Sequence, residues 1–158
     1  MRSNFELDDR DWAILALLQR NASLSVQDIA DQVGLSANPC WRRIKQMEEA
    51  GVIARRVAIV DPAKIGFAST AFVAIRTNRH DPEWLALFAN AISEIDQVME
   101  CHRMAGDVDY MLKVRVRDIA DYDQVYRKLI ARVPGLIDVT TTFSMEEMKA
   151  STALPRPS

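Results

Sequence analysis

The chain has 158 residues, enough for one medium domain or two small ones, and its 49% hydrophobic and 27% charged residues are ordinary for a globular protein. This composition excludes a disordered or fibrous chain, and no apolar run reaches the roughly 18 residues that span a bilayer. The net charge of -2 lends no overall support to nucleic-acid binding, and the N-terminus lacks the apolar stretch of a secretion signal, so we expect a cytoplasmic protein without a membrane partner.

The first third of the sequence predicts three short helices. Residues 8–20 carry apolar side chains at helical spacing, with Asp8 as the N-cap. A second helix begins after Ser25, which forms a pair resembling a capping box with Asp28, and it stops at Gly34. Both ends of the second helix are therefore marked by local signals.

The third helix is capped by Ser36 and runs to Ala50, with Pro39 in its first turn, where the missing N–H costs nothing. With the preceding helix and the turn between them, it gives residues 25–50 the spacing of a helix-turn-helix. The second helix of such a motif enters the major groove of DNA, so we expect a DNA-binding segment here. Residues 52–60, which follow, are rich in β-branched side chains and are expected to be extended.

On the third helix, Cys40, Ile44 and Met47 share one face and are expected to pack against the other helices. The opposite face can bond base edges and phosphates, and residues 37–60 hold five basic against two acidic residues. The alternative is a polar face that only meets water, but the helix-turn-helix spacing favours DNA. The residues expected to contact DNA are Ser25, Ser36, Asn38, Pro39, Trp41, Arg42, Arg43, Lys45 and Gln46.

A turn at residues 61–66 predicts a boundary between domains 1–60 and 61–158. The second domain alternates between element types. Its expected elements are a strand at 68–76, a helix opened by Asp81-Pro82, strands at 98–104 and 110–116, a helix through 122–133 and a strand at 137–143. This β-α-β-β-α-β order predicts a ferredoxin-like sandwich with helices on one face of an antiparallel sheet, and thus an α+β fold class.

The sheet face without helices needs a cover. Candidate residues for that face are Val114, Val116, Val139, Thr141 and Phe143. The simplest cover is the same face of a second subunit, so we expect at least a dimer.

The segment 106–110, which reads Gly-Asp-Val-Asp-Tyr, joins two of the expected strands. It combines backbone N–H groups with carboxylates, and an amino-acid zwitterion needs both kinds of partner. The alternative is a plain hairpin turn in which Asp107 bonds its own backbone. A magnesium or calcium site is disfavoured, because Asp107 and Asp109 lack the further oxygen ligands of a calcium loop, and no cofactor is expected.

An enzyme is a competing class, since ferredoxin-like folds host catalysis. Cys101 and the adjacent His102 should point to opposite faces of a strand, so they form no pair of nucleophile and base, and His80 lies in a polar turn. Cys40 and Cys101 are also too far apart in sequence for a C-x-x-C motif, and both are expected to be small buried hydrophobes. We therefore expect no enzyme, while an amino-acid-binding assembly module without a DNA-binding role stays open.

Several motifs occur in order along the chain. They are Val33-Gly34-Leu35-Ser36, Pro39-Cys40-Trp41-Arg42-Arg43-Ile44, Glu48-Glu49-Ala50-Gly51-Val52-Ile53, Asp61-Pro62 with Gly66, Glu100-Cys101-His102, and Gly106-Asp107-Val108-Asp109-Tyr110 followed by Leu112-Lys113. This set resembles the leucine-responsive/AsnC family of bacterial regulators and spans nearly the whole chain. Family members often have a Ser-Pro-Thr/Ser-Pro turn before the third helix, whereas this chain has Ser36-Ala37-Asn38-Pro39.

The resemblance implies a winged-type helix-turn-helix domain, a strand linker and a βαββαβ domain that dimerises and often assembles into octamers. It implies a regulator of amino-acid metabolism genes on a palindromic operator. The 106–110 loop would then bind an amino-acid effector between dimers, with a neighbouring subunit contributing from residues 139–142. The effector-binding candidates are Met104, Ala105, Gly106, Asp107, Val108, Asp109, Tyr110, Ile119, Thr140, Thr141 and Thr142.

Overall fold

The computed structural model describes residues 5–157 and divides into two compact units. The helical unit contains the chain up to Ile59 together with the tail from Met148 onward, and the sheet unit is Val60–Glu147. The predicted boundary places this tail in the second domain, 61–158. In the structure this tail makes its contacts with the helical unit, where the backbone N–H of Leu154 donates to Oε1 of Gln19 at 2.7 Å.

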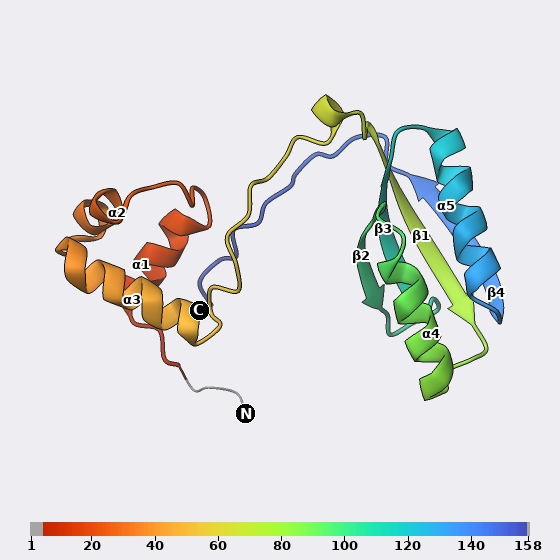
Figure 1. Ribbon diagram of the computed structural model, residues 1–158, viewed down its shortest axis with the longest axis horizontal. Coiled ribbons are helices and arrows are strands. Elements are labelled where there is room, and N and C mark those ends of the chain that lie inside the picture. The colour runs from red at the N-terminus through yellow and green to blue at the C-terminus, as the bar shows by residue number, and fades with distance from the viewer. Residues whose placement is uncertain (1–4, 158) are drawn as a thin grey trace. The chain divides into compact units, whose positions relative to one another are not determined.

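The helical unit consists of α1 (Asp9–Leu18), α2 (Val26–Val33) and α3 (Ala37–Glu49), as Figure 1 shows. Asp8 and Ser25 cap the first two helices with complete capping boxes. Gly34 ends α2 with a φ of 68°, a conformation that a side chain would strain. Ser36 occupies the N-cap position of α3, but its side chain makes no capping hydrogen bond.

The core of the helical unit forms where the three helices meet. Cys40, Ile44 and Met47 are almost completely buried there, together with Ile14 of α1 and Ile29 of α2. The predicted packing face of the third helix is therefore confirmed. Its burial fixes which side of α3 is left for solvent and ligands.

After α3 the chain is extended over residues 54–60 but forms no strand, and a short 3-10 turn, η1 (Ala63–Ile65), precedes the sheet. The strand linker implied by the family resemblance is thus an extended segment without a pairing partner among residues 5–157. Its backbone groups stay open to hydrogen bonding.

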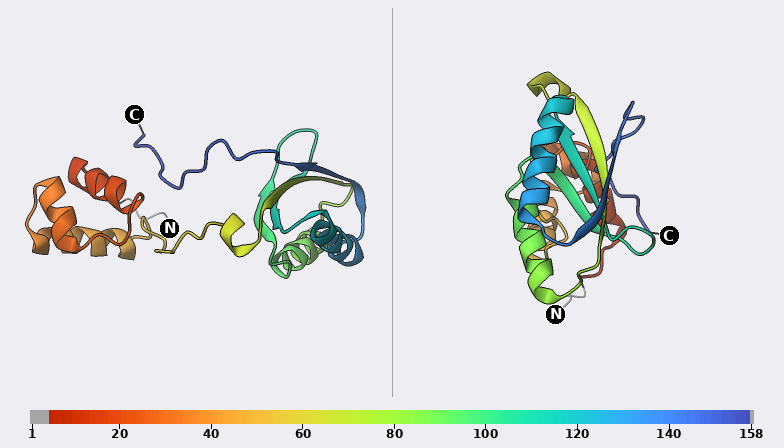
Figure 2. Two further views of the ribbon diagram at one scale, coloured as in Figure 1. Left: turned by 90° about the horizontal axis from the view of Figure 1, so that it is seen from above. Right: turned by 90° about the vertical axis from the view of Figure 1, so that its right-hand side faces the viewer.

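The sheet unit confirms the predicted order. It comprises β1 (Ser69–Thr77), α4 (Pro82–Ser93), β2 (Val98–Arg103), β3 (Tyr110–Val116), α5 (Ile119–Arg132) and β4 (Leu136–Phe143). The strands run antiparallel in the order β2-β3-β1-β4, the order of a ferredoxin-like sheet. Both helices cover the same face of this sheet (Figure 2). No described helix is long and apolar enough to cross a membrane.

The prediction for the uncovered face is wrong. Val73 of β1 pairs with Leu112 and Thr141, so these side chains share the face on which α4 and α5 pack. The five residues expected on the uncovered face all lie on this covered one; they are Val114, Val116, Val139, Thr141 and Phe143. Alternation along a strand separates two faces, but it does not say which of them the helices choose.

The uncovered face is a mixture of polar and apolar side chains. Phe72 is 41% exposed in the middle of it. Lys113 donates to Glu100 at 3.1 Å and Arg115 to Glu147 at 2.7 Å, so each of these cations already has an acidic neighbour. The face therefore carries these two ion pairs around an exposed aromatic ring, together with Arg76, which forms no ion pair among the described residues.

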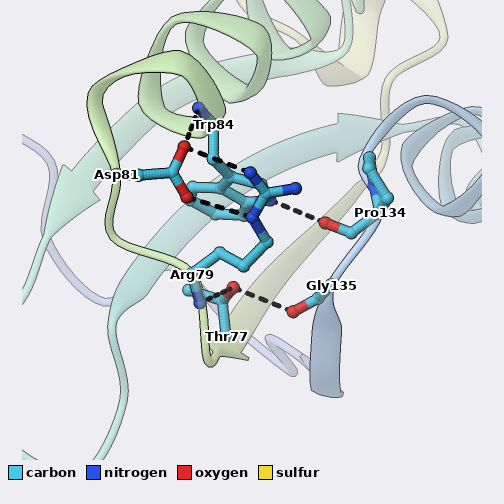
Figure 3. A network of polar contacts seen from close by, with 6 residues as sticks. All are labelled: Thr77, Arg79, Asp81, Trp84, Pro134 and Gly135. Atoms are coloured by element: carbon cyan, nitrogen blue, oxygen red, sulfur yellow. Dashed lines mark hydrogen bonds and ion pairs between the residues drawn. The ribbon is translucent and has the colours of Figure 1, made fainter.

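A polar network joins the start of α4, the end of β1 and the turn that follows α5 (Figure 3). The indole N–H of Trp84, which is 1% exposed, donates to the carbonyl of Pro134 at 2.6 Å, and Asp81 caps the helix at the backbone N–H of Trp84. Thr77 at the end of β1 donates to the carbonyl of Gly135 at 2.9 Å. These bonds hold the start of α4 against the turn that follows α5.

Replacing Trp84 with Phe removes the donor for Pro134 and leaves a small void. We expect the sheet unit to lose about 1–3 kcal/mol of unfolding free energy, measured by urea denaturation. The matched control is Trp41→Phe, because Trp41 is 50% exposed, and its change should stay within about 0.5 kcal/mol. An equal urea midpoint for unfolding of the sheet unit in the two variants would contradict this role of Trp84.

Candidate functional site

Helix α3 is attached to α1 by an ion-pair clamp as well as by its apolar face. Arg43 Nη1 lies 2.7 Å from Oδ2 of Asp8 and 2.8 Å from Oδ1 of Asp11, and the Asp11 side chain is only 6% exposed. Hydrogen bonds to Asp11 and then Asp8 raise the pKa of Arg43. The pKa of Asp8 is lowered, mainly by the hydrogen bond from the Asp11 backbone and further by Arg43. Arg43 was a predicted DNA contact, but its guanidinium is engaged inside the unit.

The remaining predicted contacts on α3 lie on its outer side. Arg42 is exposed and forms no ion pair within the part of the chain that the structure describes. Asn38, Lys45 and Gln46 are also exposed, and Trp41 is 50% exposed. This side of α3 therefore presents one free guanidinium, two amide side chains and an indole ring.

Lys45 and Glu48 form an ion pair of 2.8 Å, and Arg56 reaches the same carboxylate at 2.9 Å. The hydrogen bond from Lys45 is the main reason why the pKa of Glu48 is lowered. Glu48 therefore faces two cations and not the open side of the helix. An exposed pair of this kind is easily exchanged, so Lys45 can still turn to a phosphate.

The three predicted contacts near the helix starts differ in availability. The hydroxyl of Ser25 donates to Asp28 at 2.6 Å and accepts from the Asp28 backbone at 3.1 Å, so it is used in the cap of α2. Ser36 is exposed with no capping bond, and Pro39 is half-buried. Of the three, Ser36 is the one with a hydroxyl available to a ligand.

Sequence reasoning missed Arg10 as a positioning residue. Its guanidinium donates to the carbonyl of Val33, the last residue of α2, and a Cβ on Gly34 would lie 3.0 Å from the Arg10 Nη1. Arg10 thereby fixes the turn that sets α2 against α3. The contact joins residues 23 positions apart, so no local pattern signalled it.

The loop between β2 and β3 contains the predicted effector residues, and Asp109 anchors it. The Asp109 carboxylate accepts from the Thr77 backbone N–H at 2.8 Å and lies 3.8 Å from Nε2 of His80. Its own backbone N–H donates to Ile75 at 2.9 Å, and its carbonyl accepts from Met104 at 2.8 Å. Asp109 therefore shapes the loop, and one of its oxygens is already occupied.

The tip of the same loop is open. Ala105, Gly106 and Asp107 are exposed, and Met104 is 42% exposed. Gly106 has a φ of 150°, which favours glycine, and nothing lies within 4 Å of where a Cβ would stand. Asp107 makes no hydrogen bond within residues 5–157, so its carboxylate is available where that of Asp109 is not.

Tyr110, another candidate, is a core residue and not a loop residue. It is 4% exposed and packs on Phe88 at a centroid distance of 4.5 Å and on Trp84 at 5.9 Å. Burial raises the pKa of its phenol, and the hydroxyl has no hydrogen-bond partner among the described residues. Tyr110 thus supports the loop from beneath.

The last four candidates are not gathered at the loop within one chain. Thr141 bonds the hydroxyl of Tyr122 beneath the helices, whereas Thr140 and Thr142 pair with Ala74 and Phe72 on the uncovered face. Ile119 is 73% exposed at the start of α5, beyond the far end of β3 from the loop. A seven-residue strand is about 23 Å long, so Ile119 cannot reach the same ligand in one chain.

The residues considered for catalysis stay apart. Cys101 pairs with Leu112 and His102 with Met111, so the two side chains lie on opposite faces as predicted. Cys101 is exposed, contrary to expectation, because β2 is an edge strand. No group of three or more metal-ligating side chains occurs in the described chain.

A helix-turn-helix with a free cationic face, followed by a ferredoxin-like unit with an open loop, defines a DNA-binding regulator with a ligand-binding domain. Family models agree: a winged helix-turn-helix DNA-binding domain matches residues 7–54, and the Lrp/AsnC ligand binding domain matches residues 70–154. The chain belongs to the Lrp/AsnC family of transcriptional regulators, which are not enzymes.

Relatives match over nearly the whole length. The glutamate uptake regulatory protein of Zymomonas mobilis is 49% identical, covering 96% of this chain and 92% of that protein. An AsnC family transcriptional regulator from Agrobacterium tumefaciens has a TM-score of 0.91 at 50% identity, covering 94% and 97% of the two chains. A transcriptional regulator from Neisseria meningitidis, solved as a complex with L-Met, has a TM-score of 0.89 at 29% identity, covering 95% and 97%.

Arg43→Ala should destabilise the helical unit by about 1–3 kcal/mol, because the buried oxygen of Asp11 loses its cation. Asp8 has a lowered pKa, so its contribution is complete above its unfolded value of about 4 and is lost as the pH falls through the folded value. The loss of unfolding free energy caused by Arg43→Ala should therefore be constant from about pH 7 to 5 and become smaller below about pH 4, as measured by urea unfolding.

The control for this prediction is Arg127→Ala, which removes an exposed pair with Asp123 on α5. Its effect should be under about 1 kcal/mol at every pH. If Arg43→Ala were as mild as the control, Arg43 would not be the clamp that positions α3.

Proposed function

We propose that the outer side of α3 reads DNA in the major groove and that Arg42 supplies its main base contact. The observation that supports this is a difference between two adjacent arginines. Arg43 is paired with Asp8 and Asp11, whereas Arg42 is exposed and free of ion pairs among the described residues. A free guanidinium can bond guanine bidentately, while Lys45 and Ser36 suit phosphates. The protein would then act in the cytoplasm, where bacterial DNA lies.

The cationic patch on one chain is small, so two copies are proposed to bind together. The uncovered sheet face supports a dimer contact, because Phe72 is exposed there and Lys113 and Arg115 already have acidic neighbours. Covering such a face leaves few uncompensated charges. A symmetric dimer reads a palindromic operator, and assembly of dimers into octamers is proposed on the family resemblance.

The effector is proposed to be an amino acid held at the tip of the β2–β3 loop. The match to a ligand binding domain and the L-Met complex of the Neisseria relative support this class of ligand. Asp107 can accept hydrogen bonds from an ammonium group, and the backbone N–H groups around Gly106 can serve a carboxylate. Residues 140–142 and Ile119 would reach this site only from a neighbouring copy. Binding would modulate the expression of amino-acid metabolism genes.

Arg42→Ala should weaken binding to the specific site by roughly 1–3 kcal/mol and relax its base preference, because a bidentate contact is lost. The measurement is a gel-shift titration on duplex DNA from the region upstream of the gene that encodes this chain, repeated at several salt concentrations. Arg127→Ala, on α5, should bind as the unchanged chain does. If the unchanged chain shifted no DNA even at low salt, the proposed reading role would fail.

Asp107→Asn should abolish the thermal shift caused by an amino acid while leaving DNA binding without effector intact, because it removes the charge that holds the ammonium group. The ligands are the common amino acids, screened singly by thermal denaturation. Asp123→Asn, on the exposed side of α5, is the matched control. A thermal shift of the same size in Asp107→Asn and the control would place the effector elsewhere.

A further inference from the structure

The chain connects its two units twice. It leaves the helical unit after Ile59, forms the whole sheet unit, and returns to the helical unit at Met148. A segment that ends a chain is usually frayed unless specific contacts hold it. The tail of this chain has such contacts.

Two sets of polar contacts hold the tail to α1. The side-chain amide of Gln19 both accepts from the backbone N–H of Leu154 at 2.7 Å and donates to its carbonyl at 3.4 Å. Arg156 lies 2.8 Å from the carboxylate of Asp9. Gln19 is the C-cap of α1 and Asp9 is its first residue, so the two contacts lie at opposite ends of a helix about 15 Å long.

The tail bridges a groove and does not fill it. An open cavity of about 670 Å³ lies beneath it in the helical unit. The cavity is lined mainly by apolar side chains, among them Trp12, Leu15, Leu18, Val52 and Val57. Leu154 is 76% exposed, so the attachment rests mainly on the polar contacts of Leu154 with Gln19 and of Arg156 with Asp9.

These contacts are weak because the groups that form them are exposed to water. Asp9 and Arg156 are 86% and 55% exposed, and such a pair is screened by salt. The Gln19 bonds are exposed to competing water. The attachment is therefore reversible under ordinary solution conditions, and a moderate rise in salt acts directly on one of its two points.

We propose that residues 151–157 form a releasable strap whose docking surface is the outer side of α1. When it is docked, the chain links the two units at two places, after Ile59 and before Met148; when it is released, only the link after Ile59 remains. A second link between the units reduces the volume that the helical unit can explore. In a dimer with one α3 bound to DNA, docking therefore raises the effective concentration of the other α3 near its half of the site. This consequence rests on the proposed DNA reading by a dimer, whereas the strap itself does not.

The test of docking is hydrogen exchange at the Leu154 amide in the full chain. Gln19→Ala removes both bonds and should bring exchange to the rate of an unstructured peptide. Gln19→Glu keeps an acceptor for the Leu154 N–H but loses the donor, so its protection should be intermediate. Gln124→Ala, on the exposed side of α5, should match the unchanged chain. Circular dichroism verifies that every variant is folded.

Salt separates the two attachment points. Raising salt from about 0.05 to about 0.5 M should reduce the protection of Leu154 in the unchanged chain, and Arg156→Ala should remove most of that dependence. The strap is overturned if the Leu154 amide exchanges equally fast in the unchanged chain and in Gln19→Ala.

The effect of tail docking on DNA binding is tested with duplex DNA from upstream of the chain's gene, long enough to contain both halves of the operator. A chain that ends at Ala150 should bind it about three- to tenfold more weakly, with the same loss in Gln19→Ala. Equal affinity in all these proteins would overturn the restraint. If the unchanged chain bound no DNA while Leu154 stayed protected, the proposed reading role would fail and the strap would stand.

Discussion

Helix α3 has to be held firmly on one side so that the other side can be offered to a ligand, and most features of the helical unit serve this attachment. Cys40, Ile44 and Met47 bury the inner side, and Arg43 ties it to the acidic start of α1. Arg10 fixes the turn that precedes it. Because a 3.6-residue period separates the two sides, the neighbouring residues Arg42 and Arg43 differ: Arg42 is exposed and Arg43 is paired with Asp8 and Asp11.

The sheet unit is also buried on one side, and here every second residue along a strand faces the helices. Its covered face contains the aromatic cluster of Trp84, Phe88 and Tyr110, and its uncovered face contains Phe72 and the ion pairs of Lys113 and Arg115. The β2–β3 loop rises from the end of this sheet and is held at its base by Asp109. A rigid base with an exposed tip is the arrangement expected of a binding loop.

Few cations among the described residues of the helical unit are left free for DNA. The whole chain has a net charge of -2, so attraction to DNA has to come from a local arrangement of cations. Several basic side chains of the helical unit are tied to acids: Arg43 to Asp8 and Asp11, and Arg56 to Glu48. In the proposed function, a helical unit with few free cations would therefore need a second copy on the same DNA, and the proposed strap would favour binding of that second copy.

The sequence by itself determined the elements and their order, since caps such as Ser25 with Asp28, the stop at Gly34 and the apolar periods are local signals. It also determined the inner face of α3. Only the tertiary structure decided which sheet face the helices cover, that Arg43 and Asp109 are used internally, and that the tail returns to Gln19. Each of these depends on contacts between residues far apart in the chain, and a local pattern specifies what a side chain can do but not which distant partner it meets.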